Sequence, residues 1–360
     1  MLEGDAAFVE EGVLRVGSRR VSAKGWVIAA GSAPIRPAIE GLDDVVAHVI
    51  TSDDVFDLAS IPSSVAVVGS GSVGVELGQF LARAGARVHV VGEDDRVAGL
   101  GPGKPREAIV AALARELTLH SASRIAHVGG SRTAEGRGDV AVALVSGETF
   151  WVERILLAAG RRPDVGGLGL EWMGVRVSGG VPSHDEHLRT TNPAVFVAGD
   201  AAGAPGLLHT ATLQGRAAGA NAARGEKGTL VRPALEPLMR IAFCDPMVAT
   251  VGLDPSEAEA AGRAVYVASR PWSQQAKARI LDETEGVAQL VVERGSREIV
   301  GCQIVGEGAD LLIHMVSYAM QSGGKVEDLI RMHHYHPTLA EMIPAVAREV
   351  VRGMGGDCSP

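Results

Sequence analysis

A glycine-rich turn carries the clearest chemistry in the sequence. Gly69, Gly71 and Gly74 form a GxGxxG pattern that follows the apolar run VAVV and opens a helical stretch. In such a turn the first glycine permits the tight bend, the second lets the backbone approach a pyrophosphate, and the third allows close packing of helix and strand. The helix N-terminus adds partial positive charge. We therefore predict that this turn binds the pyrophosphate of a dinucleotide; a glycine turn without a ligand is the alternative.

An acidic loop follows the next apolar run. Glu93 stands 19 residues after Gly74 and is followed by Asp94, Asp95 and Arg96. A carboxylate here suits a ribose 2′-hydroxyl, whereas at ~4 Å it would repel a 2′-phosphate by ~1 to 4 kcal/mol. The loop therefore predicts NADH rather than NADPH. Arg96 would soften that preference, and a solvated acidic loop is the alternative interpretation.

A histidine-rich segment, HHYHPTLAE, stands near the C-terminal end. We expect Pro337 at the first position of a helix and Glu341 within its first turns. The carboxylate can then orient an imidazolium at His336, which is what a thiol-activating general base requires. Two other interpretations stay open. One is a metal site built from His333, His334 and His336, for which no fourth ligand is close, and the other is a set of surface histidines.

A Gly-Asp pair, Gly199 and Asp200, follows the apolar run at residues 195–198. At the carboxyl end of a parallel strand, such a carboxylate lies where open α/β sheets bind ligands. It can accept hydrogen bonds from a polyol or ribityl chain. A plain turn is the alternative.

The elements that position the glycine turn form a predicted βαβ unit. Strands are predicted over residues 65–68 and 87–91, with a helix between them. One apolar stripe of that helix is predicted to pack on the sheet. Its members are Val73, Leu77, Phe80, Leu81 and Ala84.

Two segments resemble each other: VIAAGSAP, which contains Gly31, and LLAAGRRP, which contains Gly160. We interpret both as closing strands of two related domains, since self-similarity indicates repeated architecture. The spacing between Gly71 and Gly160, applied backwards from Gly31, places the glycine turn of the first domain ahead of Met1. The sequence therefore leads us to expect a missing front end.

Beyond residue 231 the pattern changes to strands alternating with helices, which predicts a separate α+β domain. Asp254 as N-cap, Pro255 at the first position and Gly262 past the end delimit one helix. A second helix begins near residue 309 and has an apolar side. The members of that side are Leu311, Leu312, Met315, Val316, Ala319 and Met320.

Composition limits the class of protein. A net charge of −9 and the absence of a basic stretch with aromatic residues argue against nucleic acid as a partner. The longest apolar runs are strand-sized and the start shows no signal-peptide pattern, so we expect a cytoplasmic protein with no membrane partner. Cys244, Cys302 and Cys358 form no close pair and are expected to be buried or tail thiols.

Together these motifs resemble the pyridine nucleotide-disulfide oxidoreductase family, with the dihydrolipoamide dehydrogenases as the most similar branch. The resemblance covers nearly the whole chain. It rests on the order of AAGSAPIRP, the turn from Gly69 to Glu76, AAGRRPD, VFVAGD with GLLHTA, FCDPMVATVG and HPTLAE. It implies two Rossmann-like domains, the first of them incomplete, followed by an α+β dimerisation domain.

The resemblance also implies cofactors, partners and site residues. FAD and NAD would carry electrons between a nicotinamide and a small dithiol or disulfide. The chain would form a homodimer through residues 231–360, where His336 and Glu341 would serve the partner subunit's site. The implied cofactor-binding residues are Gly31, Gly69, Gly71, Gly74, Glu76, Glu93, Gly160, Gly199, Asp200, Leu208, His209 and Ala211.

The implied domains are 1–60 as a remnant of the FAD-binding domain, 61–164 as the NAD(P)-binding domain, 165–230 as the remainder of the FAD-binding domain, and 231–360 for dimerisation.

Several positions depart from the family pattern. The first glycine turn and the paired cysteines that follow it in the family are absent from this sequence, so disulfide chemistry by these residues is not expected. Gly92 stands where an acidic ribose contact is usual, so that Glu93 must replace it, and Cys244 stands where Thr is usual. Two alternatives are a mercuric reductase-like flavoenzyme, suggested by Cys358, and a noncatalytic NADH-binding dimer.

Overall fold

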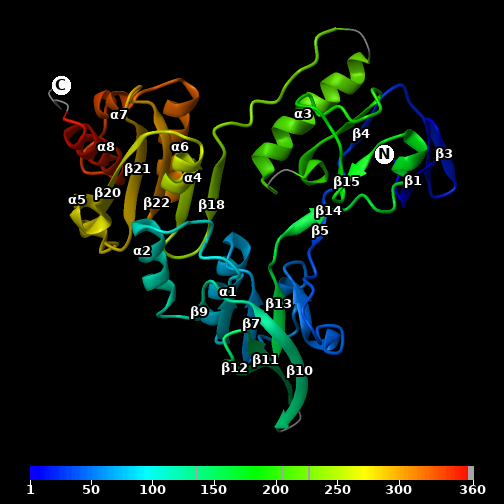
Figure 1. Cartoon of the computed structure of the whole chain (residues 1–360), viewed down its shortest axis with the longest axis horizontal. Coiled ribbons are helices and arrows are strands. Elements are labelled where there is room, and N and C mark those ends of the chain that lie inside the picture. The colour runs from blue at the N-terminus through cyan, green and yellow to red at the C-terminus, as the bar shows by residue number, and fades with distance from the viewer. Residues whose placement is uncertain (135–136, 204–205, 226–227, 356–360) are drawn as a thin grey trace. The chain divides into compact units, whose positions relative to one another are not determined.

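The computed structural model describes residues 1–134, 137–203, 206–225 and 228–355. The chain divides into two compact units (Figure 1). Unit 1 combines Met1–Ile35 with Gly160–Leu235, and unit 2 combines Arg36–Ala159 with Glu236–Pro360.

Unit 2 contains a five-stranded parallel sheet. Its strand order is β6 (Val49–Thr51), β13 (Arg154–Leu157), β7 (Ser64–Val68), β8 (Arg87–Val91) and β9 (Thr118–His120). Helix α1 (Ser72–Arg83) joins β7 to β8, and α2 (Lys104–Leu113) precedes β9. Val65, Ala66 and Val67 of β7 are fully buried, as expected for a central parallel strand with both faces covered. The predicted βαβ unit is thus present.

The predicted face of α1 is partly wrong. Leu77 and Leu81 are buried, but Val73 and Phe80 are 45% and 44% exposed, and Ala84 is exposed too. Gly74 and Gly78 face the sheet instead; a Cβ on Gly78 would lie only 3.2 Å from Val90. The glycines let the helix axis approach the strands so closely that the larger side chains are turned to its flanks.

A three-stranded antiparallel sheet lies between β9 and β13 in the chain. It consists of β10 (Ile125–Ala134), β11 (Arg137–Leu144) and β12 (Thr149–Val152).

The second sheet of unit 2 has five antiparallel strands. Their order is β18 (Met239–Ala242), β19 (Val248–Gly252), β22 (Ile299–Val305), β21 (Val287–Glu293) and β20 (Val265–Pro271). Helices α6 (Ala309–Gln321) and α8 (Met342–Gly353) pack on this sheet, and α2 contacts its strands β21 and β22. The remaining helices here are α4 (Pro255–Ala260), α5 (Ala276–Leu281) and α7 (Val326–Arg331).

The two sheets of unit 2 share an apolar core. Cys244, Val248 and Val305 pack in one cluster with Val67 and Ile109. The glycine turn and the C-terminal helices are therefore held in one unit.

Two helix predictions for this region have different outcomes. Asp254 caps α4 as predicted, accepting a hydrogen bond from the backbone N–H of Glu257. On α6, Leu312 and Val316 are buried, whereas Leu311 is 71% exposed. The prediction is therefore wrong for Leu311, because the sheet covers only the side of α6 that carries Leu312, Ile313 and Val316.

Unit 1 is built from short strands. In it β1 (Ala6–Glu10), β2 (Val13–Val16) and β3 (Arg19–Ser22) form an antiparallel sheet, and β4 (Trp26–Ile28) pairs in parallel with β17 (Val195–Val197). A second pair consists of β5 (Ser32–Pro34) and β14 (Arg161–Pro163), and a third of β15 (Val177–Ser178) and β16 (Val181–Pro182). Helix α3 (Leu208–Arg224) packs on β17.

The two similar sequence segments meet physically. Strand β5 comes from the first segment and β14 from the second, and Ala33 lies opposite Arg162 in their antiparallel register. Each strand follows its glycine, Gly31 or Gly160, and both glycines have positive φ.

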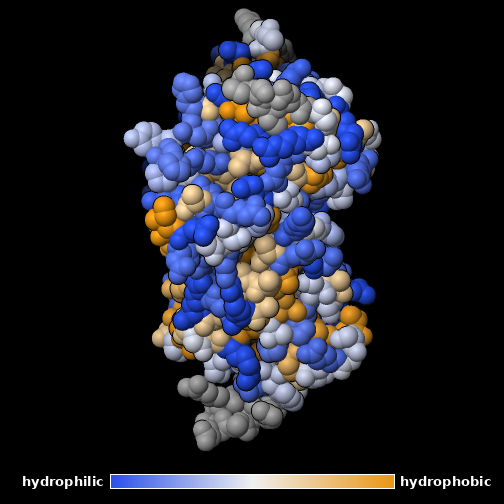
Figure 2. Space-filling view, turned by 90° about the vertical axis from the view of Figure 1, so that its left-hand side faces the viewer, coloured by the Kyte–Doolittle hydropathy of each residue, from blue (hydrophilic) through white to orange (hydrophobic). Residues whose placement is uncertain are grey.

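The face shown in Figure 2 is mostly hydrophilic, with apolar residues gathered in small separate patches. Over the described part of the chain, none of the helices combines the length and apolar character needed to cross a bilayer.

Candidate functional site

The glycine turn has one open position between two closed ones. A Cβ on Gly69 would lie 2.3 Å from the carbonyl oxygen of Ala158, and one on Gly74 would lie 1.9 Å from the carbonyl oxygen of Gly69. A Cβ on Gly71 would meet no described atom within 4 Å. The outer glycines are thus required by packing, whereas the middle one leaves space over the turn.

That space lies at the start of α1. Gly71 is the N-cap of the helix and provides no side-chain cap, so the first N–H groups of α1 lack the usual capping oxygen. Unsatisfied N–H groups and the helix dipole together favour an anion. The turn also follows β7, at the carboxyl end of the parallel sheet, where open α/β sheets bind ligands. The arrangement suits a pyrophosphate.

Ser70, inside the turn, explains the glycine at position 92. Its hydroxyl donates to the carbonyl oxygen of Arg96 at 2.7 Å, and its own carbonyl accepts from Ala98 at 2.8 Å. A Cβ on Gly92 would lie 2.1 Å from the Ser70 Oγ. A side chain at position 92 is therefore excluded by this contact, which the sequence did not reveal.

Glu93 follows at the end of β8, the strand next to β7. Its side chain is 79% exposed, and one carboxylate oxygen lies 3.9 Å from the Nε of Arg124. The structure thus brings an accessible carboxylate to the same sheet edge as the glycine turn.

Glu76 is directed to the C-terminal domain. Its Oε1 accepts a hydrogen bond from the backbone N–H of Phe243 at 2.8 Å, and burial raises the pKa of this carboxyl. The contact ties α1 to the end of β18. The cofactor contact implied for Glu76 stays a prediction.

In unit 1, Asp200 is positioned by Ser32, a residue that no sequence motif singles out. Ser32 donates from Oγ to Asp200 Oδ2 at 2.6 Å, and the Nε of Arg161 donates to the same hydroxyl at 3.0 Å. Ser32 and Arg161 are equivalent residues, because each directly follows the glycine of one of the two similar segments. That internal similarity was the only signal in the sequence that could have found them.

The start of α3 lies beside the strand end that carries Asp200. A Cβ on Gly199 would lie 3.4 Å from the Cβ of Ala211, so the glycine permits this approach. Leu208 is 85% exposed and His209 is exposed as well. The predicted Asp200 thus lies in a short turn that packs on α3, and Leu208 and His209 are exposed at the start of that helix.

His336 and Glu341 form the expected pair. The Nδ1 of His336 lies 3.0 Å from Glu341 Oε1, and the backbone N–H of Thr338 donates to Oε2 at 3.0 Å. This N–H, and then the imidazole, lower the pKa of Glu341. An ionised carboxylate therefore holds the ring, as an orienting group for a base should.

The predicted helix start at Pro337 is wrong. Thr338 is the N-cap, and a short 3₁₀ helix (Leu339–Glu341) leads into α8. Glu341 sits at the third position, where its carboxylate can reach back to the N-cap N–H. The capping geometry thus fixes the carboxylate that holds His336.

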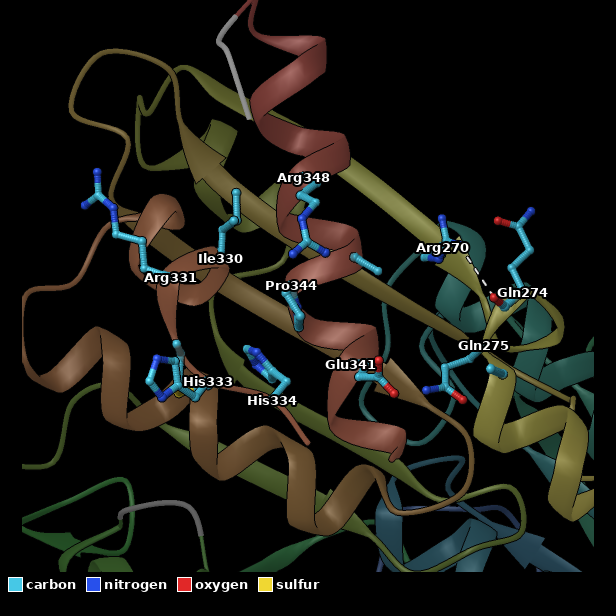
Figure 3. A pocket seen from close by; sticks show the side chains of 13 residues that line it. Arg270, Gln274, Gln275, Ile330, Arg331, His333, His334, Glu341, Pro344 and Arg348 are labelled. Carbon is cyan, nitrogen blue, oxygen red and sulfur yellow. Dashed lines mark hydrogen bonds between the residues drawn. The ribbon is translucent and has the colours of Figure 1, made fainter. Parts of the chain in front are cut away.

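A cavity of about 600 Å³ has Glu341, but not His336, in its lining. Figure 3 shows Glu341, His334 and Arg348 around it, with Arg270 and Gln274 on the other side. Burial lowers the pKa of His334, and Arg270 is paired with Glu349 at 2.6 Å. Within the described residues, no group of three or more His, Cys, Asp or Glu side chains is placed to hold a metal ion.

The cysteines do not form a redox pair in the described structure. Cys244 and Cys302 are buried and free, and burial raises the pKa of each thiol to about 12. Neither is a thiolate at neutral pH, which nucleophilic exchange requires. Cys358 lies outside the described residues.

Comparison with known proteins gives a consistent picture. Residues 2–215 match the family described as pyridine nucleotide-disulphide oxidoreductase, and residues 238–347 match its dimerisation domain. Dihydrolipoyl dehydrogenase 2 of Haloarcula marismortui is 33% identical over 96% of this chain and 74% of its own length. Mercuric reductase of Streptomyces lividans is 30% identical over 97% of this chain and 73% of its own length.

Solved structures show the same fold. The HOCl-induced flavoprotein disulfide reductase RclA from Escherichia coli superposes with a TM-score of 0.85 at 20% identity, over 96% of this chain and 78% of the other. LpdA from Mycobacterium tuberculosis gives 0.81 at 25% identity, over 96% and 76%. The predicted α/β class, with Rossmann-like domains and a C-terminal dimerisation domain, is confirmed.

Proposed function

Because the chain belongs to the pyridine nucleotide-disulphide oxidoreductase family, whose members use FAD and NAD(H), we propose that it transfers electrons between NAD(H) and FAD. The observation that carries the proposal is the open position at Gly71, between glycines closed by packing and above uncapped helix N–H groups. A pyrophosphate fits there, and the exposed carboxylate of Glu93 suits an unphosphorylated ribose.

The residues present fit one end of FAD. Asp200 is fixed by Ser32 and can accept hydrogen bonds from the ribityl chain, and Leu208, His209 and Ala211 provide a surface for the ring system. Gly31, Gly160 and Gly199 shape the backbone around these residues. When bound, FAD supplies the relay between a nicotinamide and a second electron carrier. Residues 1–360 contain one GxGxxG pattern, and the proposal assigns it to the nicotinamide dinucleotide.

His336 is proposed to move a proton for a small dithiol or disulfide at the partner subunit's site, oriented by Glu341. Cys244 and Cys302 do not supply the disulfide, since both are buried with raised pKa values. We therefore expect residues 1–360, taken alone, to be inactive in disulfide exchange.

Two other functions are candidates. Identities of about 30% to mercuric reductases support a mercuric reductase-like flavoenzyme, and the third candidate is a noncatalytic NADH-binding dimer.

We propose a homodimer through residues 231–360, supported by the match to the dimerisation domain. Leu311 and Tyr318, seven positions apart on α6, are 71% and 73% exposed and lie on one helix face. This apolar surface is the proposed contact.

Two further predictions remain. One is the set of domain boundaries after residues 60, 164 and 230, and the other is the cytoplasmic location.

Purified protein would test the proposed function through its visible spectrum and its binding of NADH. We expect flavin absorbance that Asp200→Ala reduces, and NADH binding that Gly71→Ala weakens. Each variant is the control for the other, because the two sites use different residues. A flavin-free protein that binds NADH would favour the noncatalytic dimer, and failure to bind NADH would refute the proposal.

A further inference from the structure

Two guanidinium groups beside the acidic loop are already bound by carboxylates. Arg106 donates to the carbonyl oxygen of Asp95 at 2.5 Å and to its carboxylate. Arg96 donates through Nη2 to Asp254 Oδ2 at 2.7 Å and to Glu257 Oε1 at 3.0 Å. Its Nη1 donates to the carbonyl oxygen of Gly99 at 3.0 Å. Each of these two cations is thus neutralised where it lies.

The backbone of Arg96 is part of the dinucleotide turn. Its carbonyl oxygen accepts the hydrogen bond from Ser70, the residue between Gly69 and Gly71. The side chain of Arg96 therefore begins beside the pyrophosphate position, on the strand-end loop that also carries Glu93. The direction of the Arg96 side chain therefore decides whether a guanidinium group is available beside the adenosine ribose.

The carboxylates that hold Arg96 come from the dimerisation domain and are themselves fixed. Asp254 is 5% exposed, and its Oδ1 accepts from the N–H of Glu257 at 2.8 Å and from Ser256 at 2.7 Å. In return, Glu257 Oε2 accepts from the N–H of Asp254 at 2.9 Å. One oxygen of each carboxylate is thus used to cap α4, and the other oxygen binds Arg96.

The charge state of Asp254 suits this role. Burial opposes its ionisation, but hydrogen bonds from Glu257 and Ser256, with the guanidinium of Arg96, hold the pKa of Asp254 below its usual range. The ion pair therefore persists throughout the neutral pH range.

We propose that Asp254 and Glu257 set the preference for NAD(H) over NADP(H), by holding Arg96 away from the adenosine ribose. The inference rests on the proposed binding of the dinucleotide at residues 69–74. A 2′-phosphate needs a cation such as an arginine fork, while Glu93 repels it. Selectivity at the nucleotide site is thus set by a helix cap 158 residues away in sequence.

The test is a double substitution that removes both charges and keeps the cap. In Asp254→Asn with Glu257→Gln, Asn still caps the helix and Gln still accepts at the third position, while the amide groups no longer attract Arg96. The dissociation constants of NADPH and NADH would be measured by nucleotide fluorescence at fixed low salt. Glu259→Gln, an exposed position on the same helix, is the matched control for loss of charge.

We expect the ratio of the NADPH to the NADH dissociation constant to fall by about tenfold in the double variant, or about 1.4 kcal/mol, because the released guanidinium can pair with the 2′-phosphate. Adding Arg96→Gln should restore the ratio, and Glu259→Gln should leave it within about twofold. An unchanged ratio in a double variant that still binds NADH would overturn the inference alone. A fall in this ratio that persists after Arg96→Gln is added would also overturn the inference. Failure of the unsubstituted chain to bind NADH would refute both the inference and the proposed function.

Discussion

Alanine substitutions at two glycines of the turn should separate folding from binding. At Gly74 the new Cβ would lie 1.9 Å from the carbonyl oxygen of Gly69, whereas real Cβ atoms do not approach within 3.0 Å. The start of α1 would have to move by about 1 Å, at a cost of about 1–3 kcal/mol. Gly74→Ala should therefore lower the free energy of unfolding by about that amount.

At Gly71 the opposing effects on stability nearly cancel. The backbone there has φ −68° and ψ −176°, which alanine adopts freely, so reduced freedom of the unfolded chain stabilises by about 0.4–1 kcal/mol. Alanine is a poorer N-cap than glycine by about 0.5–1 kcal/mol. Gly71→Ala should therefore stay within about 0.5 kcal/mol of the natural chain. Its methyl group, however, would occupy the space assigned to the pyrophosphate.

Denaturant unfolding followed by circular dichroism gives the stability, and titration with NADH gives the affinity. We expect Gly71→Ala to bind NADH at least about tenfold more weakly, or about 1.4 kcal/mol, with unchanged stability. Gly74→Ala should lose stability. Normal NADH binding by Gly71→Ala would refute the assignment of the open position, and normal stability of Gly74→Ala would refute the packing argument.

Three further predictions concern the other sites. The folded structure depresses the pKa of Glu341 below its ordinary value of 4.5, so the ionised carboxylate stabilises the fold fully above that pH and loses this effect as the pH falls through the folded pKa. The free energy of unfolding of the natural chain should therefore exceed that of Glu341→Gln near neutral pH. A difference between the two that does not shrink in acid would contradict this. Leu311→Arg with Tyr318→Arg should convert a dimer to a monomer in light scattering, whereas Phe56→Arg, at a residue that is 75% exposed and lies outside residues 231–360, should not; a double variant that stays dimeric would exclude this surface. In Cys358→Ser, Cys244 and Cys302 should resist iodoacetamide until the chain is unfolded, as mass spectrometry would show, and rapid labelling of the folded chain would contradict their burial.

The sequence determined features that depend on near neighbours in the chain. The spacing of Gly69, Gly71 and Gly74, the Asp254 cap of α4 and the βαβ order follow from local backbone requirements, and the structure contains all of them. The pairing of His336 with Glu341 was also predictable, because the two residues are only five positions apart. The position of the N-cap was not predicted, because the helix begins after Thr338 and not at Pro337.

Only the tertiary structure decided the contacts between distant segments. Ser32 holds Asp200 from 168 residues away, and Asp254 holds Arg96 from 158. No periodicity or spacing encodes such pairs, because they depend on which strand ends meet at one sheet edge. The orientation of α1 was misjudged for a related reason: an apolar stripe predicts which side chains prefer burial, but the close approach permitted by Gly74 and Gly78 turned Val73 and Phe80 outward.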